Sequence, residues 1–172
     1  PLSWGKSDNS KKGIYIDRES SAVFICVKEE EEPIRLFDFD AVKLLGSHNI
    51  ENTAMASAAL VLLGHGPADP AIISDYQPPK HRCAFAGSIK GITFVDDSKG
   101  TNVAATVTAM SSLKGSKIII LGGQGKGEDY APLAEAVLKY AKSAVLVGAE
   151  KKKIASAPKA KAVRIISSEP AG

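Results

Sequence analysis

The stretch KIIILGGQGKGEDYAPLAEAVLKYAKSAVLV, residues 117–147, decides the fold class. It begins with an apolar run at Lys117–Leu121, passes through a glycine-rich loop to a helical pattern over Asp129–Lys142, and ends with an apolar run at Ala144–Val147. Strand-like runs that alternate with a helix of this length predict a βαβ unit, in which the two strands are parallel. The stretch therefore indicates an α/β domain.

The same alternation of strands and helices extends on both sides of this stretch. We expect a β-hairpin of Cys83–Ser88 and Gly91–Val95, a helix over Thr101–Leu113, a helix near Glu150–Ala157 and a strand at Ala162–Ile166. Parallel strands that are joined by helices are normally covered on both faces. Residues 80–172 are therefore predicted to form a Rossmann-like three-layer domain with a mostly parallel sheet.

Residues 1–79 show a different pattern and predict part of a separate, mixed α/β domain. Their expected elements are strands at Gly13–Asp17, Ala22–Val27 and Ile34–Phe39, and helices at Ile50–Leu63 and about Pro70–Tyr76. Gly64 follows the first of these helices as a stop signal. The segment Gln77–Lys80 contains two consecutive prolines, and we place the domain boundary there.

Composition argues against several classes of protein. The net charge of the 172 residues is +3 and the lysines are scattered, which gives no basis for nucleic-acid binding. No apolar run approaches the roughly 20 residues that span a bilayer, and the first residues lack the apolar core of a signal peptide. We expect a cytoplasmic protein without membrane insertion. Cys26 and Cys83 have no CxxC spacing and are interpreted as buried free thiols, so no metal site is predicted.

The segment DDSKGTN, residues 96–102, is the strongest functional signal. It spans the turn from a strand-like run to a helical segment, which we expect to begin at Thr101. Such a turn combines a carboxylate able to accept ribose hydroxyls, the lysine at position 99, and the N–H groups of a helix start, which favour anions. The segment predicts nucleotide-dependent chemistry.

The glycine-rich loop Gly122–Gly127 also follows a strand and precedes a helix, where backbone N–H groups can hold a phosphate or a carboxylate. Its spacing does not match a P-loop, because Gly127 follows Lys126 where Ser or Thr is required. It does not match GxGxxG either, because Glu128 occupies the last glycine position. A flexible connection without a ligand is the alternative interpretation.

Two further polar segments could contact a nucleotide. In HNIEN, residues 48–52, Asn49 and Asn52 lie three apart at a helix start, so their amides can face the same side and match the edge of adenine. A simple helix cap at Asn49 is the alternative. His81 and Arg82 offer a ring for stacking and a guanidinium for phosphate, or else form an ordinary surface pair.

These segments together resemble the Mur ligase family. The matching segments are LLGSHNIENTAMASAAL at 44–60, HR at 81–82, VDDSKGTNVAAT at 95–106 and IILGGQGKGEDYAPL at 119–133. DDSKGTN stands where other branches have an Asp-Tyr-Ala-His type sequence, which favours the D-glutamate-adding branch. The resemblance covers about residues 44–168. It implies the end of the central ATP-binding domain in 1–79 and most of the C-terminal domain in 80–172, and we expect a fragment.

The resemblance implies an ATP-dependent, amide-forming ligase of peptidoglycan synthesis, a process tied to cell-wall biogenesis, cell shape and cell division. Such a ligase phosphorylates the carboxylate of UDP-N-acetylmuramoyl-L-alanine with ATP, and the amine of D-glutamate then displaces phosphate from the acyl phosphate. The implied cofactors are ATP and Mg²⁺, whose ligands are expected in a preceding region of the family. We expect a monomer, and an isolated chain without activity.

The resemblance also assigns roles to individual residues. Carried over by motif, the assignments are Asn49 and Asn52 at the adenine, His81 lining that pocket, Arg82 at the phosphates, Asp97 at the ribose, Thr101 and Lys126 at the carboxylates of D-glutamate, and Lys99 beside them, with Lys99 and Lys126 as the catalytic lysines. No residue is assigned to a metal.

Three positions depart from the usual family pattern, and two other functions stay open. Ala84, Asp96 and Gly100 stand where Glu, Asn and Ala are more usual. One alternative is a dinucleotide-binding oxidoreductase domain in which Glu150 takes the ribose. The other is a non-catalytic nucleotide-binding module that kept the fold and lost the reaction.

Overall fold

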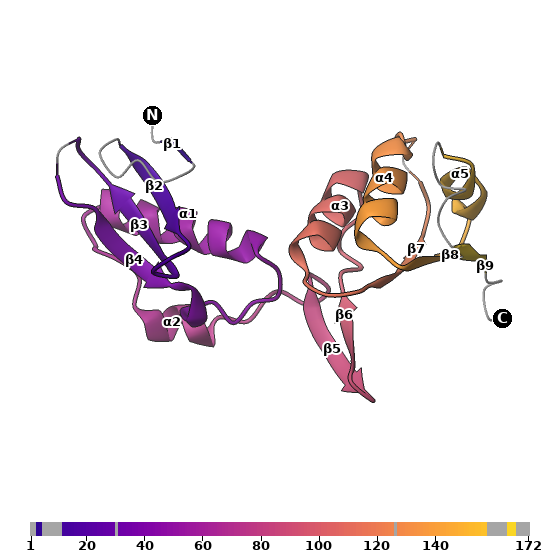
Figure 1. Cartoon of the computed structure of the whole chain (residues 1–172), viewed down its shortest axis with the longest axis horizontal. Helices are drawn as coiled ribbons and strands as arrows, with labels where there is room; N and C mark the ends of the chain where they lie inside the picture. Colours follow the sequence, from indigo (N-terminus) through magenta and orange to yellow (C-terminus); the bar gives the residue numbers. More distant parts are fainter. Residues whose placement is uncertain (1–2, 5–11, 30, 126, 158–164, 168–172) are drawn as a thin grey trace. The chain divides into compact units, whose positions relative to one another are not determined.

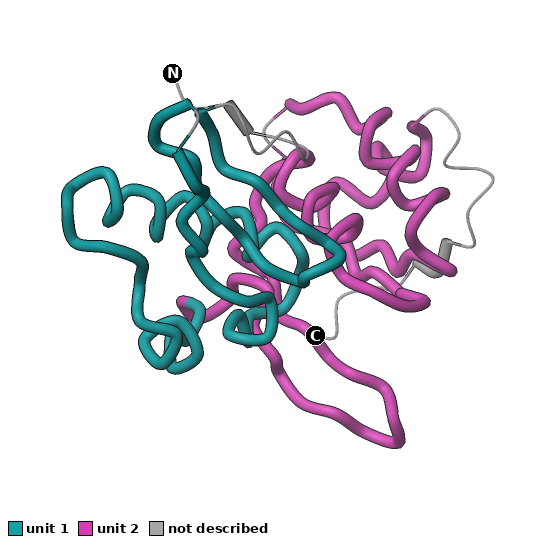
Figure 2. The backbone as a smooth tube through the Cα atoms, turned by 60° about the vertical axis from the view of Figure 1, so that its left-hand side comes forward, with its two compact units in different colours: residues 1–78 teal, residues 79–172 magenta. Residues whose placement is uncertain are grey.

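A computed structural model of the chain describes residues 3–4, 12–29, 31–125, 127–157 and 165–167 (Figure 1). The chain divides into two compact units, Pro1–Pro78 and Pro79–Gly172 (Figure 2). Each unit has its own hydrophobic core, and each is described by itself below.

Unit 1 contains a four-stranded sheet in the order β1-β2-β3-β4, followed by helices. The elements are β1 (Ser3–Trp4), β2 (Gly13–Asp17), β3 (Ala22–Cys26), β4 (Ile34–Asp38), a 3₁₀ turn η1 (Phe39–Ala41), α1 (His48–Leu62) and α2 (Pro70–Asp75). The strand β1 is parallel to β2, whereas β2, β3 and β4 are antiparallel neighbours. The three longer strands and both helices were predicted within two residues; β1 was not.

The helix α1 packs on the sheet through one face. Its core residues recur at helical spacing and are Ile50, Ala54, Ala58 and Val61, and they join the cluster formed by the strands. At its end, the backbone N–H of His65 donates to the Leu60 carbonyl and that of Gly64 to the Val61 carbonyl. This Schellman arrangement requires a left-handed residue, and Gly64 has φ +83°, so the predicted helix stop is confirmed.

Unit 2 consists of a β-hairpin and an α/β part. The elements are β5 (Ala84–Ile89), β6 (Ile92–Asp96), α3 (Val103–Ser112), β7 (Ile118–Gly122), α4 (Ala131–Tyr140), β8 (Ser143–Val147), α5 (Lys151–Ser156) and β9 (Ile165–Ser167). The hairpin turns at Lys90-Gly91, where both residues have positive φ as a type I′ turn requires. In both views the hairpin extends away from the rest of the unit (Figures 1 and 2).

The strands β7, β8 and β9 form a parallel sheet in sequence order, as the βαβ pattern predicts. The mixed α/β fold with a parallel sheet is therefore confirmed. Two helices begin two residues later than expected: Asn102 caps α3, which begins at Val103 rather than Thr101, and α4 begins at Ala131 rather than Asp129. The expected strand Ala162–Ile166 begins in residues outside the described ranges, and its described part belongs to β9.

The core of unit 2 lies on one face of this sheet. Leu121 and Leu146 pack in one cluster with residues from α3, α4 and α5, and α3 and α4 lie side by side (Figure 1). Ile118 and Ile120 point to the other face of β7 and are 66% and 70% exposed. The described residues thus supply the sheet and one helical layer, and they leave that face of β7 uncovered.

Candidate functional site

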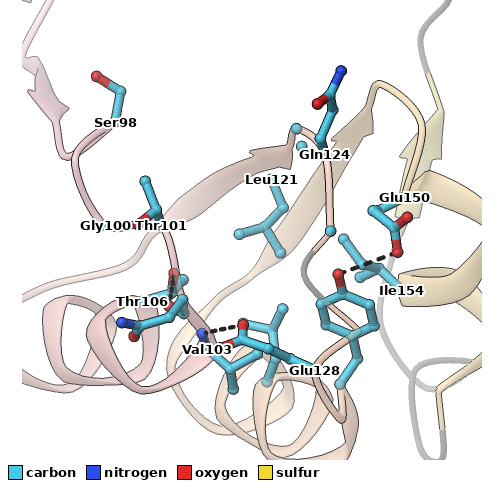
Figure 3. A pocket seen from close by; sticks show the side chains of 16 residues that line it. Ser98, Gly100, Thr101, Val103, Thr106, Leu121, Gln124, Glu128, Glu150 and Ile154 are labelled. Carbon is cyan, nitrogen blue, oxygen red and sulfur yellow. Dashed lines mark hydrogen bonds between the residues drawn. The ribbon is translucent and has the colours of Figure 1, made fainter.

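A pocket of about 300 Å³ lies in unit 2, at the carboxyl ends of β7 and β8 (Figure 3). It is lined by the end of the DDSKGTN segment and the first turns of α3 (Ser98, Gly100–Val103, Thr106), the end of β7 and the glycine loop (Leu121–Gly125), and Glu128, Tyr130, Leu133, Glu150 and Ile154. Loops that follow parallel strands are the usual ligand-binding edge of an α/β sheet. The two motifs that the sequence singled out in this unit therefore share one pocket.

Hydrogen bonds tie the DDSKGTN segment to the residues that precede the hairpin. The Asp97 Oδ1 accepts the backbone N–H of Cys83 at 3.0 Å, and the backbone N–H of Lys99 donates to the His81 carbonyl at 2.9 Å. His81 and Cys83 have φ of 68° and 42°, a conformation that L residues rarely adopt. The two segments that were expected to bind nucleotide are thus held together, at the cost of local backbone strain.

Asp96 fixes the start of the same turn. Its Oδ1 accepts the backbone N–H of Ser98 at 2.9 Å, and its Oδ2 lies 2.7 Å from Nδ1 of His81. The Ser98 hydrogen bond, followed by the His81 contact, lowers the pKa of Asp96 to about 2. The aspartate at this family-divergent position is therefore an ionised partner of the imidazole.

The first turn of α3 is occupied by side chains of the protein itself. Asn102 Oδ1 accepts the N–H of Ala105 at 2.7 Å, and Glu128 Oε2 accepts the N–H of Val103 at 3.0 Å (Figure 3). These are two of the N–H groups that a helix start offers to an anion. An incoming anion at this helix end would meet a site that already holds one carboxylate.

At two positions of the glycine loop, other residues of the protein lie too close to leave room for a side chain. A Cβ on Gly122 would lie 2.4 Å from Val147 Cγ2, and a Cβ on Gly125 would lie 2.4 Å from the Glu150 carboxyl carbon. Gly123 instead has φ +125°, a conformation that favours glycine. Lys126, which was predicted to bind D-glutamate and to act in catalysis, lies outside the described residues.

Glu150 joins three parts of the pocket. Its Oε2 accepts a hydrogen bond from the Tyr130 hydroxyl at 3.2 Å, and its Oε1 accepts one from the Lys153 ammonium at 3.0 Å. Its carboxylate also packs closely against Gly125. The Lys153 bond is the largest cause of the lowered pKa of Glu150. Burial, and then the charge of Glu150, raise the pKa of Tyr130. The site therefore holds an ionised carboxylate beside a neutral phenol.

The structure brings together some of the predicted site residues and leaves others apart. Thr101 is exposed and lines the pocket, whereas Lys99 is exposed and is not among the lining residues. In unit 1, Asn52 Nδ2 donates to Asn49 Oδ1 at 3.3 Å, so the two amides do face the same side. Asn49 also donates to the Leu45 carbonyl at 2.7 Å. It lies inside the first turn of α1, with Ser47 at the cap position, so the cap interpretation of Asn49 is wrong.

His81 and Arg82 are exposed in the segment just before the hairpin. Both cysteines, Cys26 and Cys83, are free and buried, as predicted. Within the described ranges, no group of three or more His, Cys, Asp or Glu could hold a metal ion. The helices of this part of the chain also include none that is long and apolar enough to cross a bilayer.

Sequence reasoning missed two pocket residues and misjudged the role of a third. Glu128 was treated only as a missing glycine, and Tyr130 was not considered. Glu150 was assigned only to the oxidoreductase alternative. An acidic residue directly after a βα glycine loop, and another within three residues of the end of the next strand, are signals that could have placed Glu128 and Glu150 at this edge of the sheet.

Comparison with known proteins identifies the class to which this fold and site belong. Residues 81–171, more than half of the chain, match the family model described as "Mur ligase, glutamate ligase domain". The chain therefore belongs to the Mur ligase family.

Individual relatives narrow this class. A UDP-N-acetylmuramoylalanine--D-glutamate ligase of Bordetella avium is 45% identical over 118 residues, which cover 67% of this chain and 23% of the relative. Proteins of the same name from Albidiferax ferrireducens and Ralstonia nicotianae are 40% and 42% identical, over 78% and 72% of this chain and 27% and 25% of theirs. The chain thus spans about a quarter of the length of the curated relatives it matches.

Proposed function

We propose that this chain is part of an ATP-dependent ligase that joins D-glutamate to UDP-N-acetylmuramoyl-L-alanine in peptidoglycan synthesis. The observation that carries the proposal is the single pocket that the DDSKGTN segment and the glycine loop share at the carboxyl ends of β7 and β8. The similarity to named D-glutamate ligases supports the substrate.

The proposed reaction has two balanced steps. The carboxylate of the substrate attacks the γ-phosphate of ATP, forming an acyl phosphate and ADP. The free amine of D-glutamate then attacks the acyl carbon, the amide bond forms, phosphate leaves and the amine loses a proton. The task of the protein is to hold three anionic reactants together and to compensate their charge.

Residues of unit 2 fit the amino-acid side of this reaction. A volume of about 300 Å³ suits a compact dicarboxylic amino acid. Thr101 offers a hydroxyl at the pocket wall, and we assign it and Lys126 to the carboxylates of D-glutamate. Lys99 lies in the adjoining turn, and we assign its ammonium to the developing negative charge beside them.

We also assign nucleotide contacts to residues within each unit, taken separately. In unit 2 we place the ribose at Asp97, the phosphates at Arg82 and the wall of that site at His81. One oxygen of Asp97 accepts the Cys83 N–H, which fixes the orientation of the carboxylate. In unit 1 we place the adenine at the amide pair of Asn49 and Asn52.

Further assignments concern the whole enzyme. We propose that 1–79 is the end of the central ATP-binding domain and that 80–172 belongs to the C-terminal domain. Mg²⁺ would neutralise the charge of the phosphates. Among the described residues, no group of three or more His, Cys, Asp or Glu could hold the ion, and we assign none of them as its ligand. Because the reaction consumes ATP, we place the enzyme in the cytoplasm. We also propose that it acts as a monomer.

The test is an assay of the complete protein that the gene encodes. Phosphate release should require ATP, UDP-N-acetylmuramoyl-L-alanine and D-glutamate together, and the product should gain the mass of one glutamyl residue. L-glutamate serves as the matched control. Nucleotide binding without release of phosphate in the presence of all three substrates would overturn the proposal and favour a non-catalytic binding module.

A further inference from the structure

The carboxylate of Glu150 is unusual among the pocket residues, because it belongs to one loop and its bonds hold another. It lies three residues after the end of β8 at Val147, at the N-cap position of α5. It packs against Gly125 in the loop after β7, and it accepts a hydrogen bond from Tyr130, which precedes α4. The side chain is only 13% exposed, so these contacts are sheltered from water. Figure 3 shows the bond from the Tyr130 hydroxyl to Glu150.

The carboxylate of Glu150 fills the space in which a side chain at Gly125 would lie. A Cβ on Gly125 would lie 2.4 Å from the carboxyl carbon of Glu150 and 2.6 Å from its Oε2. The φ of Gly125 is not positive, so its backbone does not itself demand glycine. A methyl group at Gly125 would therefore require the Glu150 carboxylate to move away from the loop.

The hydrogen bonds that Glu150 accepts indicate which role its carboxylate can play. An ionised carboxylate accepts through two oxygens, and here each oxygen has a donor, the Tyr130 phenol at Oε2 and the Lys153 ammonium at Oε1. Both oxygens are therefore engaged, and the ammonium compensates the negative charge. A carboxylate arranged in this way is suited to fixing a loop and poorly suited to binding the amine of a substrate.

We propose that Glu150 is a positioning residue, which sets the conformation of the glycine-rich loop at Gly125 and thereby the shape of the D-glutamate pocket. The inference rests on the proposed function for its substrate, and on the geometry alone for the loop. Glu128 directly follows the loop, and its carboxylate accepts the N–H of Val103 in the first turn of α3. One carboxylate thus packs against the loop at Gly125, and another anchors the chain just after Gly127.

The first test compares Glu150→Ala and Glu150→Gln in the complete protein, with Glu19→Ala, in an exposed turn of unit 1, as the control. We expect Glu150→Ala to raise the KM for D-glutamate by about 10-fold to 100-fold, as small misplacements of binding groups do. The KM for ATP should stay unchanged. Glu150→Gln keeps one acceptor oxygen and the shape, so its effect should be smaller and in the same direction.

The second test is a double-mutant cycle with Gly125→Ala. In the unsubstituted protein the added methyl group would displace the Glu150 carboxylate from the loop, so we expect Gly125→Ala to raise the KM for D-glutamate by about 10-fold. In the Glu150→Ala background the space is empty, and the same change should have a much smaller effect. Independent effects that simply multiply would overturn the proposed contact.

Hydrogen exchange of the backbone amides at 123–125 provides a readout that does not depend on activity. Glu150→Ala should speed exchange there and leave β2 and β3 unchanged. If the KM rises while loop exchange stays the same, Glu150 contacts substrate directly and the positioning role is wrong; if neither changes, the proposal also fails. Absence of D-glutamate-dependent activity in the unsubstituted protein would refute the proposed function instead. Hydrogen exchange at 123–125 in Glu150→Ala would still decide whether Glu150 positions the loop.

Discussion

Replacing Gly122 with alanine should weaken the pairing of β7 with β8 at the edge of the pocket. A Cβ at this position would lie 2.4 Å from Val147 Cγ2 and 2.6 Å from the Val147 carbonyl oxygen, whereas ordinary contacts are 3.4–4 Å. The strands must therefore separate locally by about 1 Å. Forcing an extra carbon into packed structure in this way costs about 1–3 kcal/mol.

The cost can be measured as local opening by hydrogen exchange of the β7 and β8 amides. A loss of about 1–3 kcal/mol corresponds to exchange that is about 5-fold to 150-fold faster. The control is Lys142→Ala, which changes an exposed side chain just before β8 and should leave the exchange unchanged.

A second substitution identifies the atoms responsible. Val147→Ala removes Cγ2 but leaves the carbonyl oxygen in place, so in the Gly122→Ala background it should restore only part of the lost protection. Exchange in Gly122→Ala equal to that of the unsubstituted protein would refute the close approach of the two strands. Full rescue by Val147→Ala would show that the side chain alone limits the space.

Three further predictions concern the site and its surroundings. In the complete protein, Asp97→Ala should raise the KM for ATP by about 10-fold because it removes a charged hydrogen-bond acceptor, whereas Lys126→Ala should raise mainly the KM for D-glutamate; an unchanged KM in either variant contradicts that assignment. The pKa of Asp96 is lowered from 3.8 to about 2, so its contribution to stability is present above about pH 4 and is lost as the pH falls toward 2, and Asp96→Asn should remove this part of the pH dependence of thermal unfolding. Burial raises the pKa of the Cys83 thiol to about 11, and Cys26 is also buried, so a thiol reagent at pH 8 should modify either residue only after unfolding; rapid labelling of the native protein would contradict this.

Two of the three family-divergent positions have a physical explanation in the structure. Asp96 contacts His81 and so adds a charged partner for the imidazole at the start of the DDSKGTN segment. A Cβ on Gly100 would lie 2.7 Å from Asp97 Oδ2, so glycine leaves room for the present position of that carboxylate. Ala84 lies in β5 opposite Asp96, and nothing in the structure explains the alanine there.

Local patterns in the sequence were enough to predict most of the elements. The strand–helix alternation of 117–147, the Gly64 helix stop and the Lys90-Gly91 hairpin turn all depend on interactions between residues close in the chain. The parallel pairing of β7 with β8 also followed, because a helix between two strands leaves few other connections. The same reasoning placed the DDSKGTN segment and the glycine loop at strand-to-helix turns.

Only the tertiary structure showed how these turns are joined. Glu128 reaches the first turn of α3 across 25 positions, and Glu150 reaches Tyr130 across 20. It also showed that the helices cover one face of β7 and leave Ile120 exposed on the other. Hydrophobic periodicity reports which residues an element can bury, and turn chemistry reports where it ends. Neither reports which distant carboxylate fills the space beside a glycine, because that choice depends on how the finished elements pack.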